Sequence, residues 1–432
     1  MKTKYLIIGG CAGGIAGAEA IRERDSEGSL TIVSEEPYLA YSRPLIAKYL
    51  SGERTVEAML YRPPSFYAEK NINYISGKRV QRLDLSTKTA YLDDDEPIEW
   101  QSLLLATGGK PIIPKLEGSG KRGVFNFIKL DDARAIADYL PGVKRVVVIG
   151  GGLIGISASE ALRKKGVAVT VVEMKDRVLN TILDEAASSV AAAAVNAAGI
   201  DIITGHTVTT VLGDEQVSGA VLDDGRELPC EMVVIAIGVL PRTELAQQSG
   251  LNLGRGILVD ERMATSQPGV YACGDAAEAF DFVYGSGRVT PIWPNAVIGG
   301  RVAGANMAGD NVRYRGGTAM NSLTYFGLDI ATAGMVSPPG EADYRVYTNQ
   351  NGGAYRKVIV SPEGRLSGMV LVGDTEKAGI LFGLMRDQVD VSGLGKVLLA
   401  DDFGLAYLPR PVWQDRLSGP TSGRVTAARE GR

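Results

Sequence analysis

Two glycine-rich turns are the parts of this sequence best suited to bind a charged ligand. The first runs from Gly9 to Gly14, which hold the outer places of the pattern G-x-G-x-x-G, with Cys11 at the middle place and Gly13 within the turn. Small residues allow a tight turn that aims a helix N-terminus, with its free N–H groups and positive dipole end, at an anion such as a pyrophosphate. Because Cys11 departs from the pattern, this turn alone is a weak signal.

The second turn follows the pattern in full. Gly150, Gly152 and Gly155 occupy its three glycine places, around Leu153 and Ile154. A second phosphate-binding turn in one chain indicates a second bound nucleotide.

Each turn is followed by acid at the end of the next apolar run. Glu35 and Glu36 follow residues 30–33, and Glu173 follows residues 169–172. Glu173 lies about 20 residues past its turn, where a carboxylate can accept hydrogen bonds from both ribose hydroxyls. This spacing disfavours the alternative that the second turn only packs a helix on a strand. Two dinucleotides on one chain most commonly serve electron transfer between them.

The elements that must position these turns repeat along the chain. Residues 5–8 and 146–149 are short apolar runs typical of buried parallel strands, and residues 103–108 and 232–238 are apolar runs that end in glycine. Internal duplication is the simplest account of this repeat. A further apolar run ends in Gly274 and Asp275, where a carboxylate can meet a ligand hydroxyl.

Other segments are read from their local signals. The two prolines in residues 36–48 favour a loop leading into a short helix, and residues 75–100 alternate like an antiparallel sheet. Asn295 is the expected N-cap of a helix over 296–307, and the glycines of that helix predict very close packing, because they cost helix stability. Residues 314–411 predict a third unit, with strands at 344–348, 357–360 and 366–372 and a helix near 375–385.

Composition indicates an ordinary globular protein. The chain has 432 residues, 45% apolar and 22% charged, and a net charge of −4, which argues against nucleic acid or an anionic membrane as a general partner. No uncharged apolar run reaches the roughly 18 residues of a spanning helix. The first apolar run is too short for a leader peptide, so we expect a cytoplasmic protein.

Cysteine and histidine usage excludes several kinds of site. The three cysteines lie far apart without a C-x-x-C pair, which excludes an iron–sulfur cluster held by four cysteines and a local redox disulfide. His206 is the only histidine, and we interpret it as a loop or strand-end residue. We expect no metal site and no Ser-His-Asp or Cys-His nucleophile.

The order of these motifs strongly resembles the pyridine nucleotide-disulfide oxidoreductase superfamily over residues 1–415. The resemblance rests on both turns, both strand-glycine ends and Ala-Cys-Gly-Asp at 272–275. It implies an α/β fold with two Rossmann-like dinucleotide-binding domains, the NAD domain inserted in the FAD domain, plus a C-terminal α+β domain. The expected boundaries are 1–112 and 239–313 for the FAD domain, 113–238 for the NAD(H) domain, 314–415 for the α+β interface domain and 416–432 for a disordered tail.

The resemblance also implies FAD and NAD(H) as cofactors. Glu173 favours NAD(H) over NADP(H), because it would repel a 2′-phosphate. The flavin's pyrimidine end would face the helix N-terminus at Asn295. By match, the FAD residues are Gly9, Cys11, Gly13, Gly14, Glu35, Glu36, Arg43, Pro44, Lys48, Thr107, Gly108, Gly274, Asp275, Asn295 and Ala296. The residues for the nicotinamide cofactor are Gly150, Gly152, Leu153, Ile154, Gly155, Glu173 and Gly238.

Residues 41–48 and 371–378 look like the branch of ferredoxin, rubredoxin and nitrite-reductase-type NADH oxidoreductases. In that branch the lysine matched by Lys48 usually pairs with a glutamate at the place held here by Ser157. We therefore expect Lys48 to be an unpaired positive charge that favours a reduced, anionic flavin. Arg43 and Lys48 are the candidate catalytic residues.

The resemblance places residues 36–48 beside the flavin, and we call them the flavin-side segment. This segment contains Ser42 and no cysteine, whereas relatives that act on disulfides carry cysteine there. Electrons must then leave the flavin outward, to a protein carrier, a quinone-like molecule or oxygen. The leading prediction is an FAD-dependent oxidoreductase acting between NAD(H) and an iron–sulfur carrier or partner subunit. Residues 291–296 and the C-terminal segments resemble FAD subunits of multi-subunit aldehyde or 2-oxoacid (phenylglyoxylate-type) oxidoreductases, so a hetero-oligomeric complex is a candidate assembly. The alternatives are an NADH oxidase using oxygen and a weakly catalytic flavoprotein with an assembly or redox-sensing role, which Ser157 supports.

Overall fold

A computed structural model describes residues 1–340 and 343–408. The chain separates into two compact units. Unit 1 holds residues 1–181, 191–320 and 325–327, and unit 2 holds residues 182–190, 321–324 and the described residues from 328 on. The predicted boundaries of the two nucleotide-binding domains stay a prediction, and the predicted tail lies outside the described residues.

The first sheet of unit 1 carries the first glycine turn. Five of its strands run parallel in the order β3-β2-β1-β6-β18, and an antiparallel extension, β5-β4, continues from β6. Tyr5 faces Leu30 on one side of β1, and Ile8 faces Leu105 on the other. The strands are β1 (Lys2–Ile8), β2 (Leu30–Ser34), β3 (Ile72–Ser76), β4 (Val80–Asp84), β5 (Thr89–Leu92), β6 (Pro97–Leu105) and β18 (Val270–Ala272).

The second sheet of unit 1 carries the second glycine turn, and all its pairings are parallel, in the order β11-β10-β9-β15-β8. The apolar runs predicted as central strands are buried on both faces, as parallel strands require. The two parallel sheets confirm the predicted Rossmann-like α/β class. The strands are β8 (Val124–Asn126), β9 (Arg145–Ile149), β10 (Ala168–Glu173), β11 (Ile200–Thr204) and β15 (Met232–Ile235).

Smaller sheets complete unit 1. A two-stranded ribbon pairs β7 with β16, one three-stranded sheet follows β11 in the chain, and another follows β16. These strands are β7 (Gly109–Pro111), β12 (Val208–Leu212), β13 (Gly219–Leu222), β14 (Glu227–Pro229), β16 (Val239–Pro241), β17 (Ile257–Leu258), β19 (Ala277–Asp281) and β20 (Ser286–Arg288).

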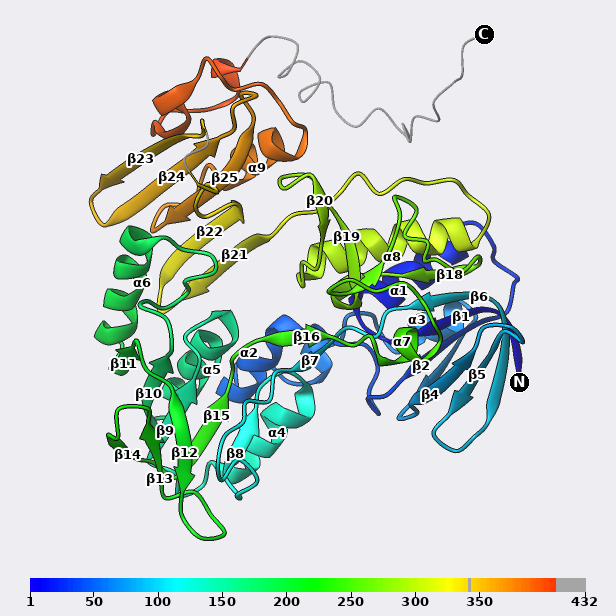
Figure 1. Cartoon of the computed structure of the whole chain (residues 1–432), viewed down its shortest axis with the longest axis horizontal. Coiled ribbons are helices and arrows are strands. Elements are labelled where there is room, and N and C mark those ends of the chain that lie inside the picture. Colours follow the sequence, from blue (N-terminus) through cyan, green and yellow to red (C-terminus); the bar gives the residue numbers. More distant parts are fainter. Residues whose placement is uncertain (341–342, 409–432) are drawn as a thin grey trace. The chain divides into compact units, whose positions relative to one another are not determined.

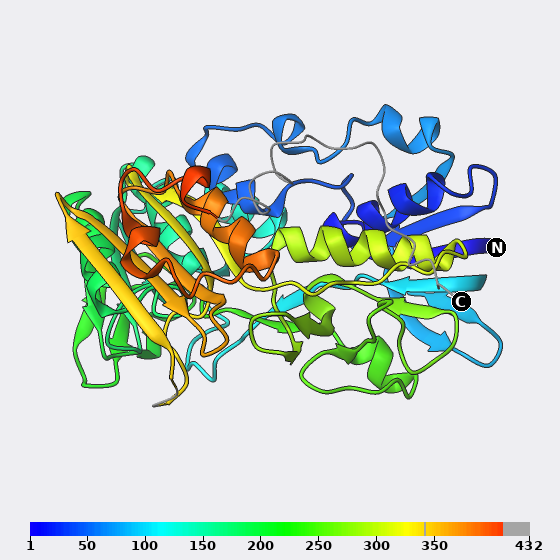
Figure 2. The same ribbon diagram turned by 90° about the horizontal axis from the view of Figure 1, so that it is seen from above.

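Helices α1 and α8 lie side by side in unit 1 (Figures 1 and 2). A Cβ atom added to Gly300 would stand 2.8 Å from the carbonyl carbon of Gly13, and one added to Gly304 would stand 2.8 Å from the carbonyl carbon of Gly17. The close packing predicted from the glycines of the later helix is therefore confirmed. The α-helices are α1 (Ala12–Arg22), α2 (Ile46–Ser51), α3 (Ser65–Glu69), α4 (Leu130–Tyr139), α5 (Leu153–Lys164), α6 (Glu185–Ala197), α7 (Glu244–Gln248), α8 (Trp293–Met307) and α9 (Ala378–Arg386).

Short 3₁₀ helices join several of these elements. One of them, with Pro44 in its first turn, leads into α2, which confirms the predicted loop and short helix. They are η1 (Arg43–Leu45), η2 (Glu57–Met59), η3 (Gly274–Ala276), η4 (Gly395–Leu399) and η5 (Leu405–Tyr407).

The start of α8 differs from the prediction. The helix begins at Trp293 with Ile292 as its N-cap, so Asn295 is not the capping residue. Pro294 fits the first turn, where no helical hydrogen bond needs its missing N–H. Trp293 packs edge-on against Tyr61 with ring centroids 5.0 Å apart, a tertiary contact that favours the earlier start.

An antiparallel sheet with α9 forms most of unit 2. Its strand order is β21-β22-β25-β24-β23, and with α9 it confirms the predicted C-terminal α+β domain. Inside this unit Lys357 binds Asp184 at 2.7 Å, and Tyr355 donates to the same carboxylate at 2.6 Å. The strands are β21 (Met320–Tyr325), β22 (Leu328–Gly334), β23 (Arg345–Asn351), β24 (Ala354–Val360) and β25 (Leu366–Val372).

Candidate active site

The first glycine turn joins β1 to α1 and has no room for side chains at its key places. Gly9 has a φ of +116°, and a Cβ there would stand 2.6 Å from the carbonyl carbon of Ala106. A Cβ on Gly14 would stand 3.1 Å from the carbonyl carbon of Gly9. Cys11 is the N-cap of α1 but makes no capping hydrogen bond, and the first helical turn has no acidic residue. The N–H groups at the start of α1 are therefore left for an anionic ligand.

The segment that ends in η3 lies next to this turn. A Cβ on Gly13 would stand 2.7 Å from the Sγ of Cys273, and one on Gly274 would stand 3.4 Å from the Cβ of Ala296. Asp275 is partly exposed beside them, and loss of solvent raises the pKa of its carboxyl group. These predicted FAD residues, which are distant in sequence, thus meet around the N-terminus of α1.

Arg43 is the cation of this group. Its guanidinium pairs with Glu36 and lies close enough to Cys11 and Asp275 to lower the pKa of both. Burial has the larger effect on each, so both pKa values remain above their usual range. Tyr41, which the sequence did not single out, donates to Glu36 at 2.5 Å and fixes that carboxylate.

Glu35 and Asn295, two of the predicted FAD residues, make contacts with other residues of the protein in this structure. Glu35 pairs with Arg242, whose backbone N–H donates to the carbonyl of Gly108 at 2.9 Å, and Thr107 donates to the carbonyl of Arg242 at 2.8 Å. The Asn295 amide donates to the carbonyl of residue 318 at 3.3 Å. Arg242 was not singled out from the sequence, although it follows soon after Gly238, the glycine that ends the second of the repeated apolar runs.

The second glycine turn joins β9 to α5. Gly150 has a φ of +106°, and Gly152 is the N-cap of α5 with nothing within 4 Å of an added Cβ. A Cβ on Gly155 would stand 3.0 Å from the carbonyl carbon of Gly150. Leu153 and Ile154 form the first turn of the helix, which has no acidic residue. This turn therefore has the same tight form as the first, with open space beside its N-cap.

Glu173 lies at the end of β10, next to this second turn. It is only 8% exposed and accepts hydrogen bonds from the N–H groups of Gly151, at 2.7 Å, and Lys175, at 2.8 Å. Gly238, which ends the strand run beside β9, has a φ of +108°. The structure thus brings together the residues predicted for the nicotinamide cofactor.

Lys48 is not an unpaired charge, so that prediction is wrong. Its ammonium binds Glu53 at 2.8 Å, and Lys164 on α5 binds the same carboxylate at 2.7 Å. These hydrogen bonds lower the pKa of Glu53 to about 2. The reason is local: Gly52 ends α2 in the left-handed conformation and turns the chain, so that the Glu53 N–H donates to the Lys48 carbonyl.

Ser157, at the place where the resemblance implies a glutamate, has a tyrosine as its partner. The Oγ of Ser157 lies 3.0 Å from the Oη of Tyr325, which donates to the carbonyl of Leu153 at 3.0 Å. Tyr325 comes long after both glycine turns in the chain and has no local sequence signal that connects it with α5.

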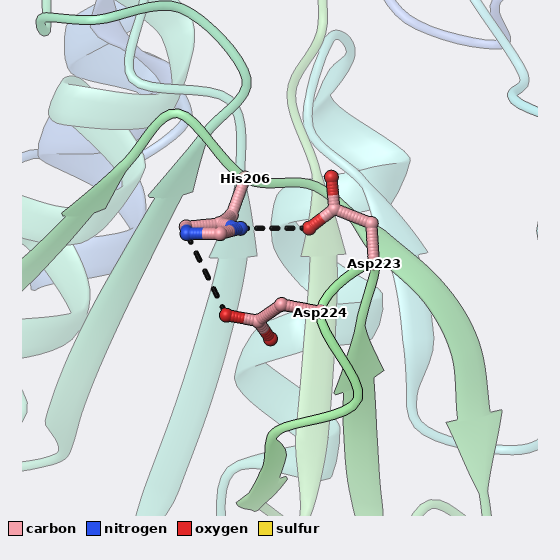
Figure 3. Close-up of side chains that lie close together, drawn as sticks. All are labelled: His206, Asp223 and Asp224. Carbon is pink, nitrogen blue, oxygen red and sulfur yellow. Dashed lines mark hydrogen bonds and ion pairs between the residues drawn. The ribbon is translucent and has the colours of Figure 1, made fainter.

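His206 lies between β11 and β12, as the sequence predicted. Its ring separates two carboxylates: Nδ1 is 2.9 Å from Asp223, and Nε2 is 3.5 Å from Asp224 (Figure 3). Arg226 also binds Asp224, at 2.6 Å. The two aspartates lie on different edges of the ring and one has an arginine partner, so we interpret the group as a surface hydrogen-bonded cluster.

None of the helices in the described part of the chain has the length and apolarity that a membrane-spanning helix needs. The family described as pyridine nucleotide-disulphide oxidoreductase matches residues 3–300, and the rubredoxin NAD+ reductase C-terminal domain matches residues 320–389.

Similar proteins agree with these matches. The chain is 31% identical over 401 residues to the NADH-dependent phenylglyoxylate dehydrogenase subunit epsilon of Aromatoleum evansii, covering 92% of this chain and 95% of that protein. A ferredoxin reductase structure from Rhodopseudomonas palustris is 27% identical, with a TM-score of 0.83 and coverage of 92% of this chain and 99% of that one. The reductase in a covalent putidaredoxin reductase–putidaredoxin complex is 26% identical, with a TM-score of 0.84 and coverage of 93% and 96%.

Proposed function

Because the chain belongs to the pyridine nucleotide-disulphide oxidoreductase family and is an NAD(H)-dependent flavoprotein reductase of the ferredoxin and rubredoxin reductase type, we propose that it passes electrons between NAD(H) and an iron–sulfur protein or partner subunit. The names of the similar proteins support both kinds of partner. One is a ferredoxin reductase, and another is a reductase in complex with putidaredoxin. The third is a subunit of phenylglyoxylate dehydrogenase.

The observation that carries this proposal is the lack of a reactive thiol in the flavin-side segment. Residues 36–53 contain no cysteine. Burial raises the pKa of all three cysteine thiols: that of Cys11 in the first turn, and those of Cys230 and Cys273 in the core of unit 1, to about 11 and about 12. A buried, protonated thiol is inert. With no disulfide to receive them, electrons from the flavin must pass to a partner outside the fold.

The proposed FAD site is the turn at the start of α1 together with Arg43, Asp275 and the residues around Gly274. The cradle fits a pyrophosphate, because its glycines exclude side chains and its helix start has free N–H groups. Bound FAD supplies the redox chemistry, accepting two electrons as a hydride and releasing them singly. The chain's residues bind and orient it, and we propose that Arg43 supplies positive charge beside it.

The proposed NAD(H) site is the turn at the start of α5 together with Glu173. We propose that the Glu173 carboxylate, already fixed by two backbone N–H groups, accepts hydrogen bonds from the adenosine ribose. Lys48 remains a proposed catalytic cation, but Glu53 partly cancels its field. Arg43, the other proposed catalytic cation, has a carboxylate partner as well, Glu36.

Anaerobic stopped-flow spectroscopy of the purified flavoprotein tests the proposal. The protein is mixed with NADH or NADPH and then with oxidised ferredoxin. We expect fast flavin bleaching by NADH and fast reoxidation by ferredoxin. If the isolated protein instead consumes oxygen as fast as it reduces a dye, it is an NADH oxidase. If neither nucleotide bleaches the flavin, the assembly or redox-sensing alternative replaces the proposal.

A partner subunit is the second form of the same proposal, favoured by coverage of 95% of the phenylglyoxylate dehydrogenase subunit. Bleaching by NADH without reoxidation by ferredoxin favours this form. Affinity purification of the tagged chain from its native source, followed by iron analysis of the copurified proteins, then distinguishes it from a different soluble acceptor.

A further inference from the structure

The turn between β21 and β22 is anchored on one face of α5. Tyr325 donates to the carbonyl of Leu153 at 3.0 Å and lies 3.0 Å from the Oγ of Ser157, and the N–H of Phe326 donates to Glu160 at 3.3 Å. The three anchor residues on α5 are spaced by four and three positions, so they form one stripe along the helix. This turn, residues 325–327, belongs to unit 1 with α5, whereas the residues on either side of it belong to unit 2.

The direction of these hydrogen bonds follows from the single phenolic proton. Since Tyr325 gives that proton to Leu153, Ser157 must donate its own proton to the Tyr325 oxygen. Tyr325 is 8% exposed, and burial raises its pKa to about 12. The phenol therefore stays protonated at neutral pH, and the chain of hydrogen bonds from Ser157 to Leu153 is neutral throughout.

The anchored residues include the first turn of the proposed NAD(H) helix. Leu153 directly follows Gly152, the N-cap, which has no side chain to hold the free N–H groups. Within this turn, the Leu153 carbonyl is held from outside the helix by Tyr325. A first turn that is already ordered loses less entropy when it binds a ligand.

We infer that Tyr325 is a positioning residue for the nicotinamide dinucleotide, and that its hydrogen bond to the Leu153 carbonyl fixes the first turn of α5 in the binding conformation. The inference rests on the proposed function, because it assigns NAD(H) to this helix.

Titration calorimetry of the FAD-bound protein with NAD+ tests the inference. Tyr325→Phe keeps the ring and removes the hydroxyl. We expect it to raise the Kd for NAD+ about fivefold, the net value of one hydrogen bond of about 1 kcal/mol. We expect unchanged flavin content and faster amide hydrogen exchange in residues 152–157. Tyr271→Phe is the matched control, because it removes a phenol bonded to the Asn306 carbonyl, away from α5, and should leave the Kd unchanged.

Other outcomes separate this inference from its premise. An unchanged Kd for NAD+ in Tyr325→Phe, with or without a lower Tm, means that the tyrosine is only structural and overturns the inference. The proposed function is then unaffected, provided that the wild-type protein binds NAD+. If the wild-type flavoprotein neither binds NAD+ nor is reduced by NADH, the proposed function fails. If Tyr325→Phe loses its flavin, Ser157→Ala decides: a Kd raised about twofold supports the inference, and an unchanged Kd overturns it.

Discussion

The contact between α1 and α8 allows a quantitative test of how the proposed FAD site is built. In Gly300→Ala, the new Cβ would stand 2.8 Å from the carbonyl carbon of Gly13 and closer still to its oxygen. Unstrained carbon–carbon contacts are about 3.5–4.0 Å, so the helices must separate by roughly 1 Å. The obstacle is backbone and cannot move aside as a flexible side chain can.

The expected cost follows from two opposing effects. Overpacking a core costs about 1–3 kcal/mol, and more where the neighbour cannot yield. Replacing glycine by alanine inside a helix favours the helix by about 1 kcal/mol. We therefore expect Gly300→Ala to destabilise the protein by about 2 kcal/mol. Because Gly13 is part of the proposed FAD turn, we also expect the variant to lose flavin on gel filtration.

Thermal unfolding and flavin content of three variants check this reasoning. Gly304→Ala meets Gly17, one turn further along α1, and should lower the Tm similarly while retaining more flavin. Gly379→Ala in α9 is the control, because an added Cβ there has nothing within 4 Å, and it should leave the Tm unchanged or raise it. Wild-type stability and full flavin in Gly300→Ala would refute the close packing.

Three further perturbations have defined outcomes. Glu173→Ala should weaken NADH binding at least tenfold and narrow discrimination against NADPH, because a charge-assisted hydrogen-bond acceptor is lost. Steady-state kinetics with both cofactors measure this. Kinetics equal to those of the wild type would show that Glu173 does not bind the ribose. Lys357→Ala should destabilise the protein by about 3 kcal/mol, measured by thermal unfolding, because it leaves Asp184, whose side chain is only 16% exposed, without its cation. Burial alone would raise the pKa of Asp184, but the Lys357 and Tyr355 hydrogen bonds outweigh it and lower that pKa. The stability that the Lys357–Asp184 pair contributes to the folded protein should then be present above about pH 4 and be lost as the pH falls further. The thiols of Cys230 and Cys273 should resist a thiol reagent at pH 8 in the folded protein and react after unfolding; fast labelling of either in the native state would show that burial does not protect it.

Much of the fold could be predicted because its signals are local. Apolar runs of strand length ending in glycine marked the central strands of both parallel sheets, and the glycines of α8 predicted a close neighbour. Positive φ angles require Gly9 and Gly150, and backbone contacts require Gly14 and Gly155, as the spacing implied, whereas Gly152 has open space beside it. The position of Glu173 beside its turn followed from the same spacing.

The sequence by itself determined the two glycine turns, the class of fold and the lack of a cysteine within the flavin-side segment, since each depends on residue types within a short stretch. Only the tertiary structure decided which charges and hydroxyls meet. Ser157 pairs with a tyrosine 168 residues away, and Glu35 pairs with Arg242, 207 residues away. Lys48 pairs with Glu53 because the chain turns at Gly52, and the pattern of charges did not indicate this turn. Side-chain pairing depends on where the folded backbone brings distant segments together, and no local periodicity records that.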